Sequence, residues 1–101
     1  MNPIAACSFY LVSYDITSNK LRRKIEKALK NFGQRIQKSV FFCVLEGDQL
    51  NNMTAALQHL LANMIALQEI GDSVVIAGPV HEKNFSFLLG NSCISKKYVL
   101  Y

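Results

Sequence analysis

The sequence predicts an α+β domain in which two helices cover one face of an antiparallel sheet. Runs of apolar and aromatic residues of strand length alternate with two segments whose apolar residues recur at helical spacing. The resulting order is strand, helix, strand or strand pair, helix, strand, which is typical of sheets with their helices on one side. The chain has 101 residues, of which 50% are hydrophobic and 18% are charged, so we expect one folded domain with one core.

The first strand is expected over residues 4–14, because the side chains from Phe9 to Tyr14 would alternate between two faces of a sheet. The helix that follows is expected over residues 18–32, with Thr17 or Ser18 as its N-terminal cap. Its apolar positions recur on one face: Leu21, Ile25, Ala28, Leu29 and Phe32. Gly33 stands where a glycine would cap the C-terminus of this helix.

Residues 35–46 are β-branched and aromatic, which predicts either one long strand or two strand segments joined by a kink. Asp48 can cap a second helix, whose apolar positions are Leu50, Met53, Leu57, Leu60, Leu61 and Met64. Gly71 and Asp72 would break this helix, and further strands are expected over residues 73–80 and 84–90. The complete order matches a ferredoxin-like βαββαβ sandwich over residues 1–90.

The strands at 9–14 and 40–45 carry apolar residues on both faces, although two helices can cover only one face of the sheet. In the second of these strands, Phe41 and Cys43 point to one side while Val40 and Phe42 point to the other. A sheet with a solvated face should alternate apolar with polar residues instead. We therefore expect a homodimer packed through the second face, with the tail at 91–101 as a candidate dimer or partner contact.

Cysteine usage and hydropathy indicate a cytoplasmic protein. Cys7, Cys43 and Cys93 fit neither a disulfide framework nor a zinc-ligand spacing, and reduced cysteines acting as small apolar residues are the simpler interpretation. No stretch approaches the ~20 apolar residues of a membrane-spanning helix. The N-terminus lacks the basic residues that open a signal peptide, so we expect no membrane partner.

The positive charge is concentrated in one segment of the chain. Residues 16–38 contain eight basic residues and one acid, Glu26, for a net charge of +7, whereas residues 39–101 carry −2. This asymmetry predicts a polyanionic partner, with nucleic-acid phosphates first among the candidates, although a solvated helix face would carry the same charges. The candidate phosphate contacts are Arg22, Arg23, Lys24, Lys27, Lys30, Arg35 and Lys38.

Asp15 stands alone at the end of the first strand, directly before the basic segment. In a two-fold dimer its two copies could approach each other, and two adjacent carboxylates require a proton or a cation between them. Mg²⁺ suits such a place because it prefers oxygen ligands and uses few carboxylates, and it could activate water against a phosphodiester. The alternative is that Asp15 shapes the turn and favours the positive N-terminal end of the helix.

Two motifs in order make the chain similar to a known family. The triplet YDI at 14–16 follows an apolar strand, and RIQKSVF at 35–41 follows the basic helix. With the predicted topology, these motifs resemble the CRISPR-associated Cas-two family of adaptation proteins over roughly positions 9–90. The resemblance implies a homodimer that holds duplex DNA between copies of the Cas-one integrase during spacer acquisition. It also implies a metal-dependent endonuclease activity on RNA or DNA, with Asp15 as catalytic residue and Mg²⁺ ligand.

The other residues that fall on positions of the family motifs are Tyr14, Arg22, Arg35, Ser39 and Phe41. Two positions depart from the pattern. Lys24 stands where some members carry Arg, which removes bidentate phosphate binding, and Phe42 stands where an acid or other polar residue is common. Three functions stay open on the sequence: a DNA-holding adaptor without catalysis, a Mg²⁺-dependent nuclease, and a toxin-like ribonuclease of the same fold.

Overall fold

The computed structural model describes residues 8–81, 84 and 86. The elements in chain order are β1 (Ser8–Asp15), α1 (Asn19–Leu29), β2 (Gly33–Gln37), β3 (Val40–Leu45), α2 (Gln49–Asn63), a 3-10 turn η2 (Ile65–Leu67) and β4 (Ser73–Val80). The expected tail at 91–101 lies outside the described residues, as does most of the strand expected over 84–90. No helix within the described residues combines the length and the apolar character that crossing a membrane requires.

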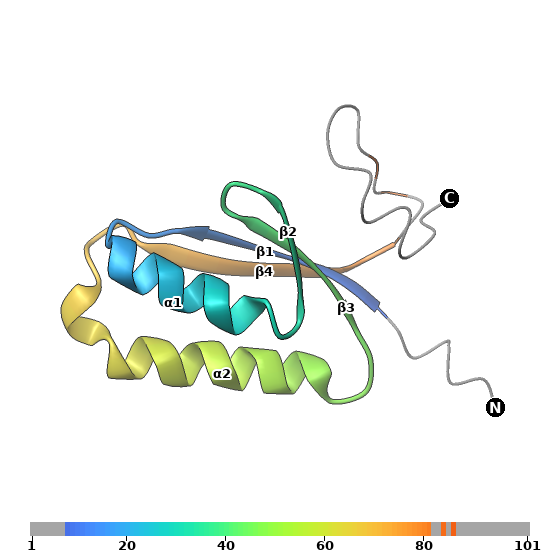
Figure 1. The fold of residues 1–101 in the computed structure, drawn as a ribbon. Helices are drawn as coiled ribbons and strands as arrows, with labels where there is room; N and C mark the ends of the chain where they lie inside the picture. Colours follow the sequence, from blue (N-terminus) through green and yellow to red (C-terminus); the bar gives the residue numbers. More distant parts are fainter. Residues whose placement is uncertain (1–7, 82–83, 85, 87–101) are drawn as a thin grey trace.

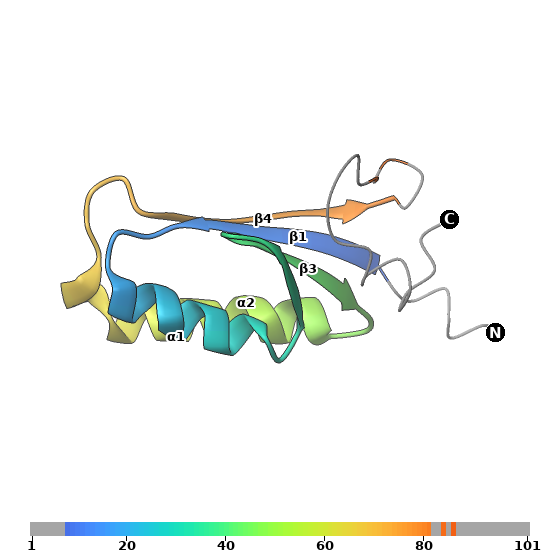
Figure 2. The ribbon, with the colours of Figure 1, turned by 45° about the horizontal axis from the view of Figure 1, so that its top comes forward.

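The four strands form one sheet in the order β2-β3-β1-β4, with every neighbouring pair antiparallel. Both helices lie side by side against the same face of this sheet, so the molecule has two layers (Figures 1 and 2). This arrangement confirms the predicted α+β class and the βαββαβ order with two helices on one face. The connection from β1 to α1 and the turn that leads into β4 lie at the same end of the sheet (Figures 1 and 2).

Helix α1 begins as the sequence predicts but ends earlier. The Ser18 hydroxyl accepts a hydrogen bond from the backbone N–H of Leu21 at 3.2 Å, which makes Ser18 the cap. The predicted C-terminal cap at Gly33 is wrong, because the helix ends at Leu29 and Gly33 opens β2. A glycine is needed there for a different reason: a Cβ atom would lie 2.2 Å from the backbone oxygen of Phe42 on β3.

The aromatic stretch at 35–46 contains two strands rather than one long strand. β2 ends at Gln37, a turn at Lys38 and Ser39 follows, and β3 begins at Val40. The register between the two strands shifts between Arg35 and Gln37, which is typical of a β-bulge close to a hairpin turn. The interpretation of this stretch as two strand segments is therefore confirmed.

Helix α2 follows Asp48, which occupies the N-cap position without a side-chain capping hydrogen bond. The helix buries Met53 and Leu57, while the other apolar positions of its predicted stripe are partly buried against the core. The core itself lies between the helices and the sheet and contains Val12, Tyr14, Ile16, Leu21, Ile25, Leu29, Phe41, Cys43, Leu45, Met53 and Leu57. Burial raises the pKa of the free Cys43 thiol to about 11, so this cysteine is a core residue and not a nucleophile.

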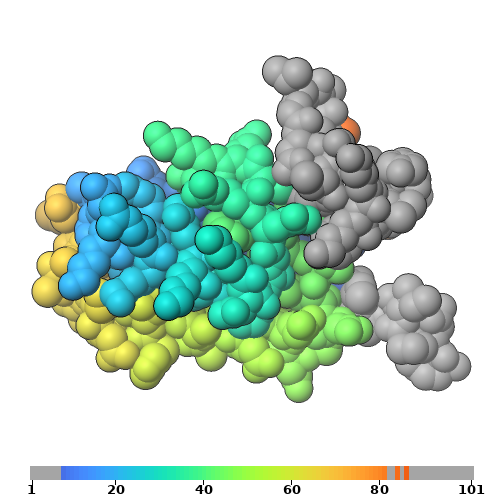
Figure 3. All heavy atoms as spheres, in the orientation of Figure 1, coloured from blue at the N-terminus to red at the C-terminus, as the bar shows by residue number. Residues whose placement is uncertain are grey.

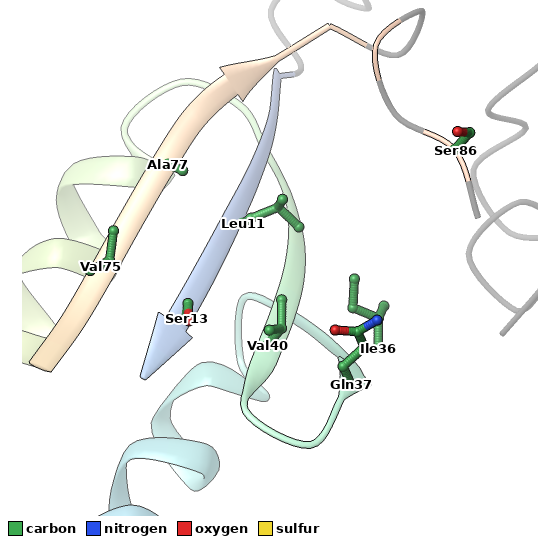
Figure 4. Close-up of a pocket in the computed structure, with 8 residues that line it drawn as sticks. All are labelled: Leu11, Ser13, Ile36, Gln37, Val40, Val75, Ala77 and Ser86. Carbon is green, nitrogen blue, oxygen red and sulfur yellow. The ribbon is translucent and has the colours of Figure 1, made fainter. Parts of the chain in front are cut away.

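The face of the sheet turned away from the helices is apolar as well. Phe42 is 1% exposed, and its ring centroid lies 5.4 Å from that of Phe9. Beside them a pocket of ≈ 340 Å³ opens on this face (Figure 4). It is lined by Leu11, Ser13, Ile36, Gln37, Val40, Val75, Ala77 and Ser86. The two-sided apolar pattern of the sequence is thus present in the fold.

Candidate metal site and nucleic-acid interface

Asp15 is the last residue of β1 and its side chain is exposed. On one side it lies opposite Ser73 of β4, whereas the ladder to β3 ends two residues earlier, at Ser13 and Val40. The carboxylate makes no hydrogen bond or ion pair within the described residues. The capping of α1 is supplied by Ser18 instead, so Asp15 does not serve as its cap.

A carboxylate without a partner at a strand end fits a Mg²⁺ ligand, because Mg²⁺ keeps several waters and takes one or two carboxylates. The described residues contain no cluster of three or more His, Cys, Asp or Glu side chains that could hold a metal. Within the described residues, Asp15 therefore does not belong to a ready-made set of metal ligands. A metal at this position needs further oxygen atoms from water, from a substrate phosphate or from the Asp15 of a second copy.

Tyr14, next to Asp15, points to the helix side of the sheet and links three elements. Its hydroxyl donates to Glu26 Oε2 on α1 at 2.7 Å, and the same oxygen is 3.2 Å from Arg35 Nη1 on β2. Burial, and then the hydrogen bond to Glu26, raise the pKa of Tyr14 to about 12. The phenol therefore stays neutral at physiological pH and acts as a brace rather than as a general base.

The remaining motif residues support the same strand end. The backbone N–H of Tyr14 donates to the carbonyl of Ser39 at 3.1 Å, which ties β1 to the hairpin between β2 and β3. Phe41 is fully buried, with its ring centroid 6.3 Å from that of Tyr14. Both residues thus support the Tyr14–Asp15 pair, Phe41 from the core and Ser39 from a partly exposed turn.

Arg22 and Arg35, two of the predicted phosphate contacts, are engaged within the chain. Arg22 Nη1 donates to the carbonyl of Ile16 at 2.7 Å, and its Nη2 donates to Asn19 Oδ1. These bonds hold the connection from β1 to α1. Arg35 pairs with Glu26, although 52% of its side chain stays exposed. Neither guanidinium is as available to a phosphate as the sequence suggested.

The other predicted contacts are exposed and make no ion pair within the described residues. With Lys20 they form what we call the basic surface: Lys20, Arg23, Lys24, Lys27, Lys30 and Lys38. α1 and the following β2 lie on one face of the molecule (Figure 3), and the turn with Lys38 follows directly. Helix α2, beside α1, contains no acidic residue and no Lys or Arg. Within the described residues, the Lys and Arg side chains therefore lie on α1, directly after it at Lys30, and on the hairpin.

Asp72 is a residue that sequence reasoning did not assign to the site. Its Oδ1 accepts hydrogen bonds from the backbone N–H of Thr17 at 3.0 Å and from the Thr17 hydroxyl at 2.9 Å. Its Oδ2 accepts from the backbone N–H of Glu69 at 2.9 Å. These donors hold the pKa of Asp72 below its usual value. The sequence carries no signal for this contact, because the two partners are 55 positions apart.

The family model of CRISPR associated protein Cas2 matches residues 8–85. An endoribonuclease Cas2 from Chloroflexus aurantiacus is 43% identical over 53 residues, which cover 52% of this chain and 57% of that protein. An endonuclease Cas2 from Halalkalibacterium halodurans is 38% identical over 56 residues, covering 50% and 58%. A Cas2 endoribonuclease from Desulforudis audaxviator is 39% identical over 75 residues, covering 73% and 64%. The chain spans less than two thirds of the length of each of these relatives.

Solved structures share the fold. The hypothetical protein TT1823 from Thermus thermophilus superposes with a TM-score of 0.56 at 32% identity, covering 71% of this chain and 84% of that one. A crystal structure of Cas2 gives a TM-score of 0.62 at 26% identity, covering 84% and 87%. A chain of a partial Cas6-RT-Cas1–Cas2 complex gives 0.60 at 21% identity, covering 85% and 96%, a likeness of fold alone.

Proposed function

This chain belongs to the family of CRISPR-associated protein Cas2, and on that premise we propose that it is a nucleic-acid-binding protein of CRISPR adaptation that holds duplex DNA against its basic surface. The observation that carries the proposal is the separation of charge between the two helices. The cations of the basic surface face solvent and make no ion pair within the described residues, whereas α2 beside α1 has no Lys or Arg. Such a surface attracts a phosphate backbone and has no features that select a base sequence.

The partners proposed with this function are a second copy of the chain and the Cas-one integrase. A second copy is supported by the apolar face of the sheet, where Val75 is 53% exposed beside the pocket of ≈ 340 Å³. The integrase is proposed because the chain belongs to the Cas2 family. With these partners we expect the protein to act in the cytoplasm, where the DNA to be captured is found.

Duplex binding is tested by removing charge from the basic surface. Arg23→Gln, Lys27→Gln and Lys30→Gln together should weaken binding and reduce the slope of log affinity against log salt by about 3, one unit for each phosphate that the variant no longer neutralises. The matched control is Ala55→Glu, Gln58→Glu and Ala62→Glu, which lowers the net charge equally from exposed positions of α2. Fluorescence anisotropy over a salt series measures both.

Two outcomes contradict this function. The first is that the unmodified chain shows no salt-dependent affinity for duplex DNA. The second is that the α2 control weakens binding as much as the α1 variant does. Equal losses would mean that net charge matters and the position of the charge does not.

A second candidate function is Mg²⁺-dependent phosphodiester hydrolysis, on RNA or on DNA, and it is supported by the unpartnered carboxylate of Asp15. Several relatives are named endoribonucleases or endonucleases. Mg²⁺ held by Asp15 would polarise the phosphodiester and lower the pKa of an attacking water. The basic surface would hold the backbone of the nucleic acid in place, and the neutral Tyr14 would brace the strand end without taking a proton.

Asp15→Asn separates this candidate from the first. We expect cleavage in Mg²⁺ to fall by roughly 100-fold or more, because the amide is a poor Mg²⁺ ligand, while duplex affinity changes little. Asp48→Asn makes the same chemical change before α2, far from the strand end, and should leave cleavage unchanged. Cleavage of labelled RNA and DNA measures the first effect and anisotropy the second. If Asp15→Asn cleaves as fast as the parent, Asp15 is not the catalytic carboxylate.

A further inference from the structure

The end of the sheet that carries Asp15 is closed by a contact between two loops. The connection from β1 to α1 and the turn that leads into β4 lie side by side in both ribbon views (Figures 1 and 2). Asp72 reaches from the second loop to the first and accepts both hydrogen bonds that Thr17 donates to it. The two loops are therefore joined by one carboxylate.

The backbone of Asp15 depends on this contact for its position. Asp15 has a strand partner on the β4 side alone, at Ser73, which directly follows Asp72. The two residues that follow Asp15 in sequence are held by side chains. Arg22 donates to the carbonyl of Ile16, and the N–H of Thr17 donates to Asp72. Asp72 thus bonds to the residue two positions after Asp15 and directly precedes the residue that pairs with Asp15.

The Asp72 carboxylate already accepts three hydrogen bonds, in contrast to that of Asp15. Three donors, the Thr17 N–H, the Thr17 hydroxyl and the Glu69 N–H, occupy both of its oxygens at 2.9–3.0 Å. The bond to Glu69 closes a tight turn, because the N–H of Asp72 in turn donates to the Glu69 carbonyl at 3.0 Å. These two hydrogen bonds between Asp72 and Glu69 therefore hold Asp72 within its own turn.

We propose that Asp72 is a positioning residue for Asp15: it fixes the connection from β1 to α1 so that the Asp15 carboxylate is presented to a divalent cation from one backbone position. The proposal rests on the metal function proposed for Asp15. Because the exposed Asp15 carboxylate has no partner within the described residues, its place depends on the backbone that carries it. Metal sites require ligands held to within about 0.5 Å, so a loosened loop weakens binding even when the ligand is intact.

The test compares Asp72→Ala with Thr17→Val, which removes the hydroxyl bond and keeps the backbone donor, and with Thr17→Ser, which keeps both. Asp48→Ala is the matched control, since Asp48 makes no side-chain capping bond. Amide hydrogen exchange at Thr17 directly measures the hydrogen bond from its N–H to the Asp72 carboxylate. Binding of Mn²⁺, followed by electron paramagnetic resonance on the folded proteins, measures its effect on the metal site. Thermal unfolding of each variant identifies any general loss of stability.

We expect Asp72→Ala to speed exchange at Thr17 and to weaken Mn²⁺ binding by about 10-fold, the lower end of the range for outer-shell partners of metal ligands. Thr17→Val should cause a smaller loss of Mn²⁺ affinity, and Thr17→Ser and Asp48→Ala none. Duplex binding by the basic surface should be unchanged in all four variants. A purely structural role would lower the unfolding temperature without changing the Mn²⁺ affinity of the folded protein.

Three results would overturn the proposal, and Asp15→Asn distinguishes the first two. If Asp15→Asn abolishes Mn²⁺ binding while Asp72→Ala leaves it unchanged, the metal site stands and the positioning role is wrong. If Asp15→Asn leaves Mn²⁺ binding unchanged, Asp15 is not a ligand, and the positioning role is lost together with the metal function. In the third result, Asp72→Ala abolishes Mn²⁺ binding while Thr17→Val strengthens it. Asp72 would then be a ligand of the metal and not a positioning residue.

Discussion

At the scale of single residues, the charged and polar groups of this chain are divided between internal bracing and the surface. Glu26, the one acid of the basic segment, holds Tyr14 and Arg35 together and so removes one cation from the basic surface. Arg22 is turned inward to the carbonyl of Ile16. Asp15, in contrast, is left without a partner in the described chain. Availability to a ligand is therefore decided residue by residue, by whether an internal acceptor or donor lies within reach.

Tyr14→Phe tests the brace. Loss of a hydrogen bond to a charged acceptor should lower the free energy of unfolding at pH 7 by about 1–2 kcal/mol. The raised pKa of about 12 means that the folded state holds the phenol proton more tightly than the unfolded chain does. The stabilisation by Tyr14 is therefore complete below pH 10 and is lost as the pH rises through about 12.

The measurement is urea unfolding of both proteins between neutral and alkaline pH. The difference in unfolding free energy between the parent and Tyr14→Phe should shrink as the pH rises above 10. Tyr10→Phe is the control, because Tyr10 makes no hydrogen bond through its hydroxyl within the described residues. A difference that stays constant with pH would show that the phenol has the same pKa in both states.

At the scale of elements, the two helices have the same packing role and opposite surface chemistry. Each buries an apolar stripe on the same face of the sheet, α1 through Leu21, Ile25 and Leu29 and α2 through Met53 and Leu57. Their exposed sides differ, since α1 is lined with Lys and Arg and α2 with Asn, Gln and Ala. Packing cannot explain this difference, because it concerns residues that face solvent. The charge-removal variants and their α2 controls test whether nucleic-acid binding explains it.

At the scale of the whole molecule, one face of the sheet is not fully covered by the described residues. The face of the sheet opposite the helices carries apolar residues around the pocket of ≈ 340 Å³, and Val75 there is 53% exposed. A second copy of the chain packed on this face would bury these residues and could bring two Asp15 carboxylates to one metal. The homodimer expected from the sequence thus stays a prediction, with a physical reason in the fold.

Val75→Glu tests the homodimer. A buried glutamate in an apolar interface is costly, so we expect the variant to be monomeric where the parent is dimeric. Light scattering after size-exclusion chromatography measures the mass of each. Ile70→Glu is the matched control, because Ile70 is fully exposed and lies outside the sheet. A parent that is already monomeric, or a Val75→Glu variant that stays dimeric, would contradict the prediction.

Most of the fold and part of the candidate site could be predicted from the sequence. The element order, the buried stripes and a helix cap at Thr17 or Ser18 could be predicted because they depend on local periodicity and local hydrogen bonding, and the structure identifies the cap as Ser18. Gly33 was misinterpreted as a helix cap because the requirement for glycine comes from a strand that follows it in sequence. The internal bonds of Arg22 and Arg35 could not be predicted either, since the same side chains on a helix or strand can face solvent or bond to a group within the chain.

By itself the sequence determined the fold class, the two-sided apolar sheet, the place of Asp15 at a strand end and the segregation of positive charge, since each follows from residue order and side-chain period. Only the tertiary structure decided which charges stay available and what holds Asp15 in place. Glu26 neutralises Arg35, and Asp72 reaches Thr17 across 55 positions. These contacts form because the antiparallel sheet brings the end of β1 to the start of β4, a proximity that no local pattern in the sequence encodes.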